Sequence, residues 1–265
     1  MLWSVLALAV LVLAYAHWVE PEWLRCPEVA VAVPGLPRQF AGVRILHVSD
    51  LHGRTHSRWG RSLVELAARL EPDLVAVTGD LAGAKDPAGP VVELLVCMAR
   101  RWPVFLVPGN HDRARGDGGR TLLSALEAGG VTVLVNSWAR WEQQGNALTV
   151  AGVDDPATGR DRVATAMRPG PVILLSHAPG VIPKLGPQRP GLVLCGHTHG
   201  GQVCVPWVGP VYTGLGSLGR KWAGGVHYLP GMTVAVSRGM GTSLLPLRFS
   251  CRPELPVYVL CREES

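Results

Sequence analysis

The chain has 265 residues, of which 48% are hydrophobic and only 17% are charged. This balance excludes a disordered chain, and the length is enough for one large domain with a substantial core. The formal net charge is +5 without any run of five basic residues. A nucleic-acid-binding stripe is therefore not indicated, whereas an anionic substrate or an anionic membrane surface suits the charge.

Residues 1–19 form an apolar segment without Asp, Glu, Lys or Arg. A helix that crosses a bilayer needs about 20 such residues. Trp3 and Trp18 flank the centre of the segment, as aromatic residues do at membrane interfaces. Residues 14–16, Ala-Tyr-Ala, also resemble the cleavage site of a signal peptide, but a positively charged start is missing. An uncleaved membrane helix is the favoured interpretation.

Three parts are expected along the chain: a transmembrane anchor at 1–19, a connector at 20–40 and one domain at 41–265. The connector is rich in Pro and Glu, and no second linker follows it. Arg25 and Arg38 lie just beyond the anchor. Counted alone, these basic residues favour a cell-membrane protein whose domain is cytoplasmic.

Short apolar runs first alternate with helical patterns. The expected strands are 29–33 at an edge, then 43–48, 74–78 and 104–107, and the expected helices are 62–70, 91–101 and 122–128. This alternation is typical of parallel strands joined by helices. Later the helices become rare, and the expected strands are 131–135, 147–153, 172–175, 192–195, 203–205, 232–236 and 256–260. Two packed sheets with helices outside would accommodate both halves.

The six cysteines include no CxxC pair, and most lie in apolar stretches. A chain of this length does not need a disulfide framework. We expect small buried hydrophobic residues and a reducing compartment.

Carboxylate, amide and imidazole side chains follow five of the expected strands. They are Asp50, His52, Asp80, Asn110, His177, His197 and His199. In α/β sheets, ligands bind beyond the carboxyl ends of the strands, so these side chains are expected at one edge. In extended backbone, the two outer residues of 50–52, and likewise those of 197–199, would point to the same side.

Mixed carboxylate and imidazole sets suit Zn²⁺, Mn²⁺ or Fe rather than Ca²⁺ or Cu(I). Seven candidate ligands exceed the needs of one ion, so two divalent ions that share a carboxylate are expected, about 3.5–4 Å apart. Glycines precede Asp80, Asn110 and His197, where they allow sharp turns. Asn110 and Asp112 have the alternative role of capping turns.

Five motifs taken together resemble the calcineurin-like metallophosphoesterase superfamily. They are SDLH at 49–52, GD at 79–80, GNHD at 109–112, SH at 176–177 and GHTHGG at 196–201. The apolar start and the stretch VPGLPRQFAGVRILHVSDLH are similar to the membrane-associated bacterial branch. Some members of that branch hydrolyse phosphodiesters, and some proteins that resemble it cleave the pyrophosphate of UDP-2,3-diacylglucosamine.

The resemblance implies a four-layer α/β/β/α fold, in which helices flank a two-sheet sandwich. It also implies the ligand sets: one ion held by Asp50, His52, Asp80 and His199, the other by Asp80, Asn110, His177 and His197. The protein phosphatases of the superfamily carry GDxVDRG, whereas residues 79–85 read GDLAGAK. A phosphoprotein phosphatase is therefore not expected.

The expected function is that of a membrane-anchored, two-metal hydrolase of phosphodiester or pyrophosphate bonds. A lipid-linked molecule such as UDP-2,3-diacylglucosamine is one candidate substrate. One alternative is a phosphodiesterase for soluble nucleotides, with the anchor only for placement. Another is an inactive metal-binding scaffold.

Four further residues are candidates for catalysis or substrate binding. His111 lies beside Asn110 and is expected to stabilise or protonate the leaving group, with a hydrogen bond to a ligand carboxylate as the alternative role. Arg54, Arg113 and Arg238 follow or approach motif loops and are candidates to bind a second phosphate, or else solvated loop residues.

An apolar loop region follows the last candidate ligand, at residues 200–207 together with Trp222. It would either rest against lipid or receive an acyl chain. Ordinary packing of an extra hairpin is the favoured interpretation.

Overall fold

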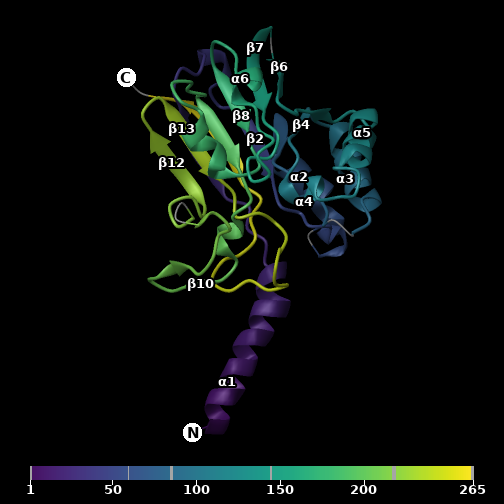
Figure 1. Cartoon of the computed structure of the whole chain (residues 1–265), viewed down its shortest axis with the longest axis vertical. Coiled ribbons are helices and arrows are strands. Elements are labelled where there is room, and N and C mark those ends of the chain that lie inside the picture. The colour runs from purple at the N-terminus through teal and green to yellow at the C-terminus, as the bar shows by residue number, and fades with distance from the viewer. Residues whose placement is uncertain (1, 59, 84–85, 144, 217–218, 264–265) are drawn as a thin grey trace.

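The computed structural model describes residues 2–58, 60–83, 86–143, 145–216 and 219–263. Figure 1 shows one body from which the first helix projects. The helices are α1 (Leu2–Ala14), α2 (Leu63–Arg69), α3 (Gly89–Ala99), α4 (Asn110–Arg113), α5 (Arg120–Ala128) and α6 (Val163–Ala166). The strands are β1 (Glu28–Val33), β2 (Arg44–Val48), β3 (Leu74–Val77), β4 (Val104–Leu106), β5 (Thr132–Val133), β6 (Ser137–Gln143), β7 (Asn146–Gly152), β8 (Val172–Leu175), β9 (Leu192–Cys195), β10 (Cys204–Val205), β11 (Gly209–Pro210), β12 (Gly225–Leu229), β13 (Met232–Val236) and β14 (Val257–Arg262).

Two six-stranded sheets form the body. The strand order is β1-β14-β2-β3-β4-β5 in the first sheet and β12-β13-β9-β8-β7-β6 in the second. In the first sheet β2 to β5 are parallel, and in the second β7, β8, β9 and β13 are parallel. The expected edge strand near residue 29 is confirmed, because β1 pairs only with β14. The short β10–β11 hairpin stands apart from both sheets.

The central strands are apolar throughout because both faces of each sheet are buried. In β3, Leu74 and Ala76 face the layer between the sheets, whereas Val75 and Val77 face the helices. In β8, Ile173 lies between the sheets and its neighbours in sequence face the opposite side. One continuous core therefore joins the sheets, and a further core covers each outer face.

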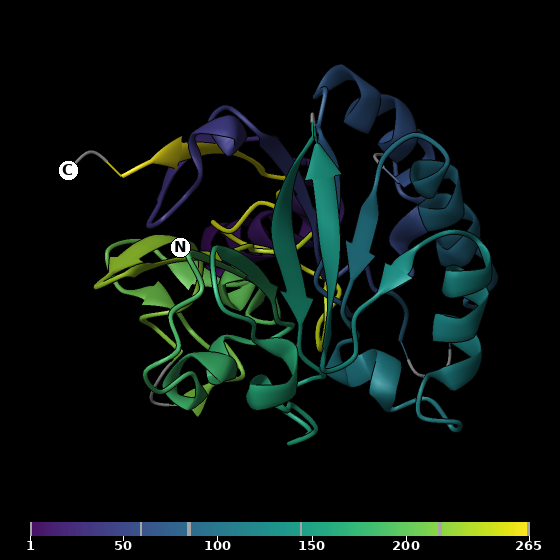
Figure 2. The ribbon, with the colours of Figure 1, turned by 90° about the horizontal axis from the view of Figure 1, so that it is seen from above.

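The predicted sandwich flanked by helices is confirmed, with outer layers of unequal thickness. Helices α2, α3 and α5 pack on the outer face of the first sheet, and Figure 2 shows these blue and teal helices together at one side of the molecule. The outer face of the second sheet is covered by the short α6, the 3₁₀ turn Pro179–Lys184 and the buried Trp222. This half has short connections, so its covering layer is thin.

Two antiparallel edge strands, β6 and β12, were not expected from the sequence. Each extends a parallel sheet by pairing with a predicted strand, β7 or β13. Exposed edges tolerate polar residues, so neither strand shows the uniform apolar run of its neighbours. The cysteine expectation is also only partly met, because Cys97 on α3 is exposed.

The first helix leaves the body almost unburied. The helical stretch Leu2–Glu22 has 21 residues, and its most apolar 18-residue window has a mean hydropathy of 2.0 and is 6% buried. Its far end is fastened to the body. Ala16 is buried and its carbonyl oxygen accepts a hydrogen bond from the backbone N–H of Arg248. The buried Glu20 carboxylate accepts bonds from the N–H groups of Ser250 and Cys251.

Phe40 joins the two sheets and supplies a test of the shared core. It is buried, and its ring lies 5.7 Å from that of Trp141. We expect Phe40→Ala to lower the free energy of unfolding by about 3–5 kcal/mol, because it removes a buried ring and leaves a cavity. Denaturant unfolding of the full chain in detergent measures this. The exposed Tyr228→Ala is the control, with an expected change below about 0.5 kcal/mol. A similarly small change for Phe40→Ala would contradict the proposed packing.

Candidate metal centre

The candidate ligands lie where the carboxyl ends of both sheets meet. Asp50 follows β2 and Asp80 follows β3 in the first sheet, whereas His177 follows β8 and His197 follows β9 in the second. Two hydrogen bonds connect the sheets here. The His177 Nδ1 donates to the Thr78 carbonyl oxygen at 2.7 Å, and the His197 backbone N–H donates to the Asp50 carboxylate at 3.1 Å. The first of these directs His177 Nε2 into the site.

Three donors form a first cluster. The Nε2 atoms of His52 and His199 are 3.1 Å apart, and Asp50 Oδ1 lies 3.5 Å from His199 Nε2. These donor atoms all lie within 4.8 Å of one another. A tetrahedral ion with bonds of about 2.0–2.1 Å has ligands roughly 3.3 Å apart. The cluster therefore fits the coordination shell of one cation.

A second cluster is built from Asn110, His177 and His197. Asn110 Oδ1 lies 3.0 Å from both His177 Nε2 and His197 Nδ1, and the two imidazole nitrogens are 3.1 Å apart. These separations again match ligands of one ion. The amide of Asn110 contributes an oxygen without adding a negative charge.

The Asp80 carboxylate lies between the two clusters. Its Oδ2 is 3.6 Å from His52 Nε2 on one side and 3.4 Å from His177 Nε2 on the other. Its Oδ1 is held by the backbone N–H of His111 at 2.9 Å. One oxygen is thus fixed, and the other is available to both clusters. This is the arrangement that a carboxylate shared by two ions requires.

The electrostatics of the site favour positive charge between these groups. Burial lowers the pKa of His52 to about 4 and that of His197 to about 3, so both are neutral at pH 7 and able to bind metal. Burial also opposes a charge on His177, but the Asp80 and Asp50 carboxylates raise its pKa to about 10. These carboxylates therefore favour a positive charge in the cluster, which a cation would supply.

The backbone at the ligands differs from the extended conformation that we expected. Asp50, His52, Asp80, His197 and His199 all have positive φ, between 46° and 71°. Such left-handed geometry is uncommon for residues with a side chain and costs of order 1–3 kcal/mol each. The loops hold it in place, and it turns each side chain back toward the junction of the sheets.

The glycines beside the ligands are needed for close approach more than for their φ angles. Of the three, only Gly79 has a positive φ. A Cβ at Gly109 would lie 2.2 Å from Asp80 Oδ1, and a Cβ at Gly196 would lie 1.8 Å from the Ser49 hydroxyl. Any larger residue would push a ligand out of position.

Asp112 supports the site from behind, a role that the sequence left as a turn cap. Its buried carboxylate accepts hydrogen bonds from the N–H groups of Asp80, Leu81 and Gly109, at 2.9–3.0 Å. The loops that carry Asp80 and Asn110 are tied together in this way. The GNHD motif contained the signal, but the three bonds depend on the fold.

A hydrogen-bonded chain behind Asp50 was not foreseen. His47 Nε2 lies 2.8 Å from the Thr78 hydroxyl, which donates to Ser49 at 2.7 Å, and Ser49 donates to Asp50 Oδ2 at 2.6 Å. Burial lowers the pKa of His47 to about 3, so its imidazole is neutral. His47 is therefore packed within the sheet, and through this chain it orients the carboxylate.

Arg248 is the largest fully buried side chain among the described residues, and it too was missed. Its guanidinium donates to the carbonyl oxygens of Gly241, at 2.6 Å, and of Arg238, at 2.8 Å. Nη1 of the same guanidinium lies 3.3 Å from the carbonyl oxygen of His199. The guanidinium thus ties the loop after β13 to a candidate ligand.

The other candidate site residues lie around this centre. His111 is at its edge, with Nε2 4.0 Å from Asp80 Oδ2 and a side chain that is 36% exposed. The guanidinium of Arg113 is paired with both carboxylate oxygens of Asp154 at 2.8 Å, and that of Arg54 is paired with Glu22. Arg238 Nε lies 4.0 Å from Glu254. None of the three arginines is among the described residues that line the adjoining cavity. Their role in phosphate binding stays a prediction.

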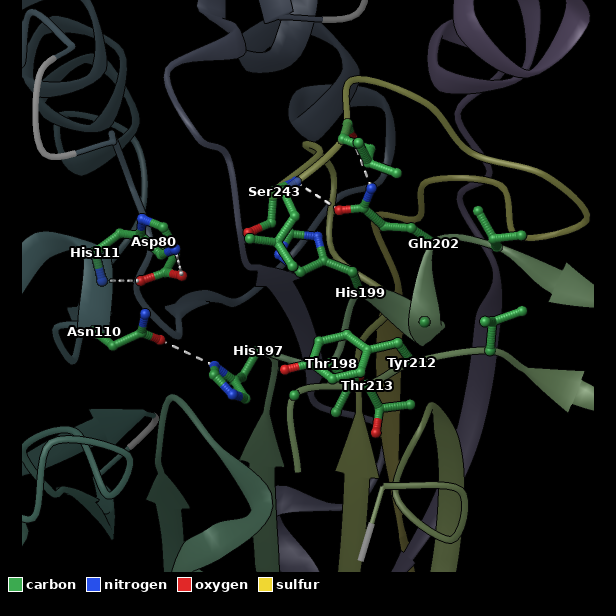
Figure 3. A pocket seen from close by; sticks show the side chains of 16 residues that line it. Asp80, Asn110, His111, His197, Thr198, His199, Gln202, Tyr212, Thr213 and Ser243 are labelled. Atoms are coloured by element: carbon green, nitrogen blue, oxygen red, sulfur yellow. Dashed lines mark hydrogen bonds and ion pairs between the residues drawn. The ribbon is translucent and has the colours of Figure 1, made fainter. Parts of the chain in front are cut away.

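A cavity of about 630 Å³ opens beside the centre. Its polar end carries Asp80, Asn110, His111, His197 and His199, and its other end is lined by Gln202, Val203, Val211, Tyr212, Ser243, Leu244 and Leu245. Figure 3 shows the Asp80 group on one side and Gln202 with Ser243 on the other. A molecule bound here would meet the candidate ligands at one end and apolar side chains at the other.

Residues 43–201 match the family described as calcineurin-like phosphoesterase. The chain is 30% identical over 256 residues to the uncharacterized metallophosphoesterase YkuE of Bacillus subtilis (strain 168), covering 93% of this chain and 88% of that protein. It is also 30% identical over 255 residues to the phosphodiesterase YaeI of Escherichia coli (strain K12), covering 93% and 92%.

Two further similarities are to a longer vertebrate protein and to a solved structure. A transmembrane protein with a metallophosphoesterase domain from Danio rerio is 32% identical over 256 residues, which cover 88% of this chain and 56% of that protein. The crystal structure of TT1561 of Thermus thermophilus has a TM-score of 0.50 at 16% identity, covering 75% of this chain and 90% of that one. The latter likeness shows the fold alone.

The position of Asp80 between the clusters predicts a loss of metal in Asp80→Asn. We expect the native full chain, purified in detergent and loaded with Mn²⁺ or Zn²⁺, to hold two ions per chain. The variant should hold one or fewer, because both clusters lose a shared anionic oxygen. Elemental analysis after gel filtration measures the ratio.

The control for this experiment is Asp117→Asn, since that carboxylate caps a surface turn away from the clusters. It should retain the native metal content. If Asp80→Asn held two ions as tightly as the native chain, Asp80 would not be a shared ligand.

Proposed function

Because the chain belongs to the calcineurin-like phosphoesterase family, we propose that it hydrolyses phosphodiester or pyrophosphate bonds at a membrane, in a substrate that carries an apolar group. The expected superfamily is confirmed, and the protein is a metal-dependent phosphoesterase that uses two divalent metal ions. Three parts go beyond this and are proposals: the type of bond that is hydrolysed, the action at a membrane, and the apolar group of the substrate.

One observation carries the two-metal chemistry on which the proposal rests: Asp80 Oδ2 faces imidazole nitrogens of both clusters, at 3.4 and 3.6 Å. We assign Asp50, His52 and His199 to one ion and Asn110, His177 and His197 to the other, with Asp80 shared. The nitrogen and oxygen donors suit Zn²⁺, Mn²⁺ or Fe.

When bound, two such cations neutralise phosphoryl oxygens and acidify the water that attacks phosphorus. The residues of the chain position the reacting groups. His111 stands at the mouth of the centre with its imidazole partly exposed. As the bond between phosphorus and the leaving oxygen breaks, His111 would give its proton to that oxygen.

The shape of the cavity supports a substrate with an apolar group. Val211, Tyr212, Leu244 and Leu245 line the end away from the candidate ligands. A phosphate at the metal centre would leave an attached acyl chain among these side chains. UDP-2,3-diacylglucosamine is one molecule with this combination. A soluble nucleotide has no acyl chain to bury there, which makes it the second candidate.

The far end of the α1 helix supports anchoring over cleavage. Cleavage after Ala16 would separate α1 from the body and cut the chain at a buried residue whose carbonyl oxygen is bonded to Arg248. We propose that the helical stretch Leu2–Glu22, which begins with α1, spans the membrane. The basic residues Arg25 and Arg38 that follow it favour the cytoplasmic side for the body.

A substrate panel tests the proposed function. The full chain in detergent micelles with Mn²⁺ is offered bis(4-nitrophenyl) phosphate, 4-nitrophenyl phosphate, a cyclic nucleotide, a phospholipid and UDP-2,3-diacylglucosamine. We expect diesters and pyrophosphates to react faster than the monoester, and an acylated substrate to have a kcat/KM at least about tenfold above the cyclic nucleotide, since burying two methylenes already gives that factor.

Asp80→Asn gives the background rate for each substrate. A preference for the cyclic nucleotide would support the soluble-nucleotide alternative. No turnover with Mn²⁺, Zn²⁺ or Fe would support an inactive scaffold.

The role of His111 is tested by the leaving group. We expect His111→Ala to retain both ions and to lose about 10²–10⁴-fold in kcat when the leaving group is an alkoxide, which needs a proton. The loss should be small for 4-nitrophenolate, which leaves readily without one. His227→Ala is the control, since His227 lies on β12, where its imidazole bonds the carbonyl oxygen of Gly224. Equal losses for both leaving groups would assign His111 to positioning instead.

A further inference from the structure

Two uncharged segments at one end of the cavity are unusually apolar for exposed loops. They are residues 203–212 and 243–247, which we call the apolar rim, and they contain no Asp, Glu, Lys or Arg. Nine large hydrophobic side chains beyond residue 23 are exposed among those that the structure describes, and seven belong to the rim. They are Val205, Trp207, Val208, Val211, Tyr212, Leu244 and Leu245. So concentrated an apolar surface marks an interaction site.

The two segments form one surface because Gln202 connects them. Its side-chain amide donates to the carbonyl oxygens of Leu245 and Leu247, at 2.9 and 3.0 Å, and its Oε1 accepts from the N–H of Ser243. The first segment continues directly from Gln202 into the β10–β11 hairpin. Figure 3 shows Gln202 between these parts of the chain.

The tip of the hairpin is the most exposed point of the rim. Trp207 has a relative exposure of 103% and a positive φ of 64°. The other tryptophan of the expected loop region, Trp222, is 4% exposed and packs in the core of the second sheet. An indole held entirely in water is unfavourable, whereas membrane interfaces are enriched in tryptophan.

The rim lies beside the place where α1 enters the body. In the segment that follows the rim, the backbone N–H groups of Arg248, Ser250 and Cys251 donate to the Ala16 carbonyl oxygen and the Glu20 carboxylate. Only a few residues of chain thus separate the rim from the end of the apolar helix. Figure 1 shows β10 and the adjacent yellow loop on the side of the body from which α1 projects.

This placement identifies the occupant of the surface. If α1 crosses a bilayer, as the proposed function holds, its body-proximal end lies at the lipid headgroups. Trp18 and Trp23 are exposed near that end, where interfacial aromatics belong. A surface fastened next to it meets the same lipid, and an uncharged apolar surface is suited to that contact.

We propose that the apolar rim inserts into the headgroup region of the bilayer that α1 crosses, so that the cavity opens onto lipid. Val211, Tyr212, Leu244 and Leu245 belong to both the rim and the cavity lining. A lipid-borne phosphoester therefore reaches the metal centre along an apolar wall, without leaving the membrane for water. This inference rests on the membrane anchoring in the proposed function.

Fluorescence quenching tests the insertion directly. The full chain is reconstituted in phosphatidylcholine nanodiscs whose acyl chains are brominated near the headgroup, and compared with unbrominated nanodiscs. We expect Trp207→Tyr to lose the quenchable contribution of one tryptophan. Trp138→Tyr, which alters an exposed tryptophan on β6, should keep the native quenching.

The outcomes separate the rim from the anchor. If Trp207→Tyr showed the same quenching as the native chain, with Trp3 and Trp18 still quenched, the insertion of the rim would be contradicted. The proposed membrane anchor would be unaffected. No quenching in any variant would overturn both. In nanodiscs that hold two copies of the chain, Trp207 could instead be shielded from bromine. That result would show that the rim is a contact between copies, and it would overturn the proposal.

Kinetics test the consequence for substrate access. Trp207 and Val208 are absent from the cavity lining, and asparagine tolerates the positive φ at 207. We expect Trp207→Asn with Val208→Asn to lower kcat/KM about tenfold for a vesicle-borne phosphodiester. Hydrolysis of soluble bis(4-nitrophenyl) phosphate should be unchanged.

Trp138→Asn should leave both reactions at native rates. An equal fall for both substrates in the rim variant would show damage to the metal centre. No change for either would show that access does not depend on the rim. Either result would overturn the proposal.

Discussion

The chemistry of this protein depends on one junction, at which the carboxyl ends of two parallel sheets face each other. Neither sheet carries a complete set of ligands. Asp50, Asp80 and Asn110 come from the first, and His177 and His197 from the second. Hydrogen bonds from His177 to Thr78 and from His197 to Asp50 hold the sheets in register. Because the donors are split in this way, closing the core between the sheets also assembles the metal centre.

The junction also holds backbone strain and electrostatic repulsion. Several candidate ligands occupy left-handed backbone geometry, and the buried carboxylates of Asp50 and Asp80 repel each other. Such an arrangement lowers the stability of the folded chain when no metal is bound. Asp112 and Arg248 stabilise it by taking up backbone N–H and carbonyl groups of the ligand loops. The large apolar core supplies the free energy that keeps these loops in place.

Most of the fold and the identities of the candidate ligands could be predicted from the sequence. Buried parallel strands are uniformly apolar, and polar residues directly after them, as in RILHVSDLH, indicate where a site must be. The conformation of Asp50 and His52 could not be predicted, because spacing does not determine φ. The ion-pair partners of the arginines could not be predicted either, since Arg54 and Glu22 are 32 residues apart and meet only through the fold. Likewise, composition did not distinguish the exposed Trp207 from the buried Trp222.

Arg248 connects the N-terminal helix mechanically to the candidate metal centre. Its backbone N–H donates to the carbonyl oxygen of Ala16, while its guanidinium reaches a loop that carries a candidate metal ligand. The apolar N-terminal helix and the candidate metal centre therefore share one rigid support. A shortened version beginning after Val19 would lose the hydrogen bond between the backbone N–H of Arg248 and the carbonyl oxygen of Ala16. The N-terminal helix is thus also a structural support of the candidate metal centre.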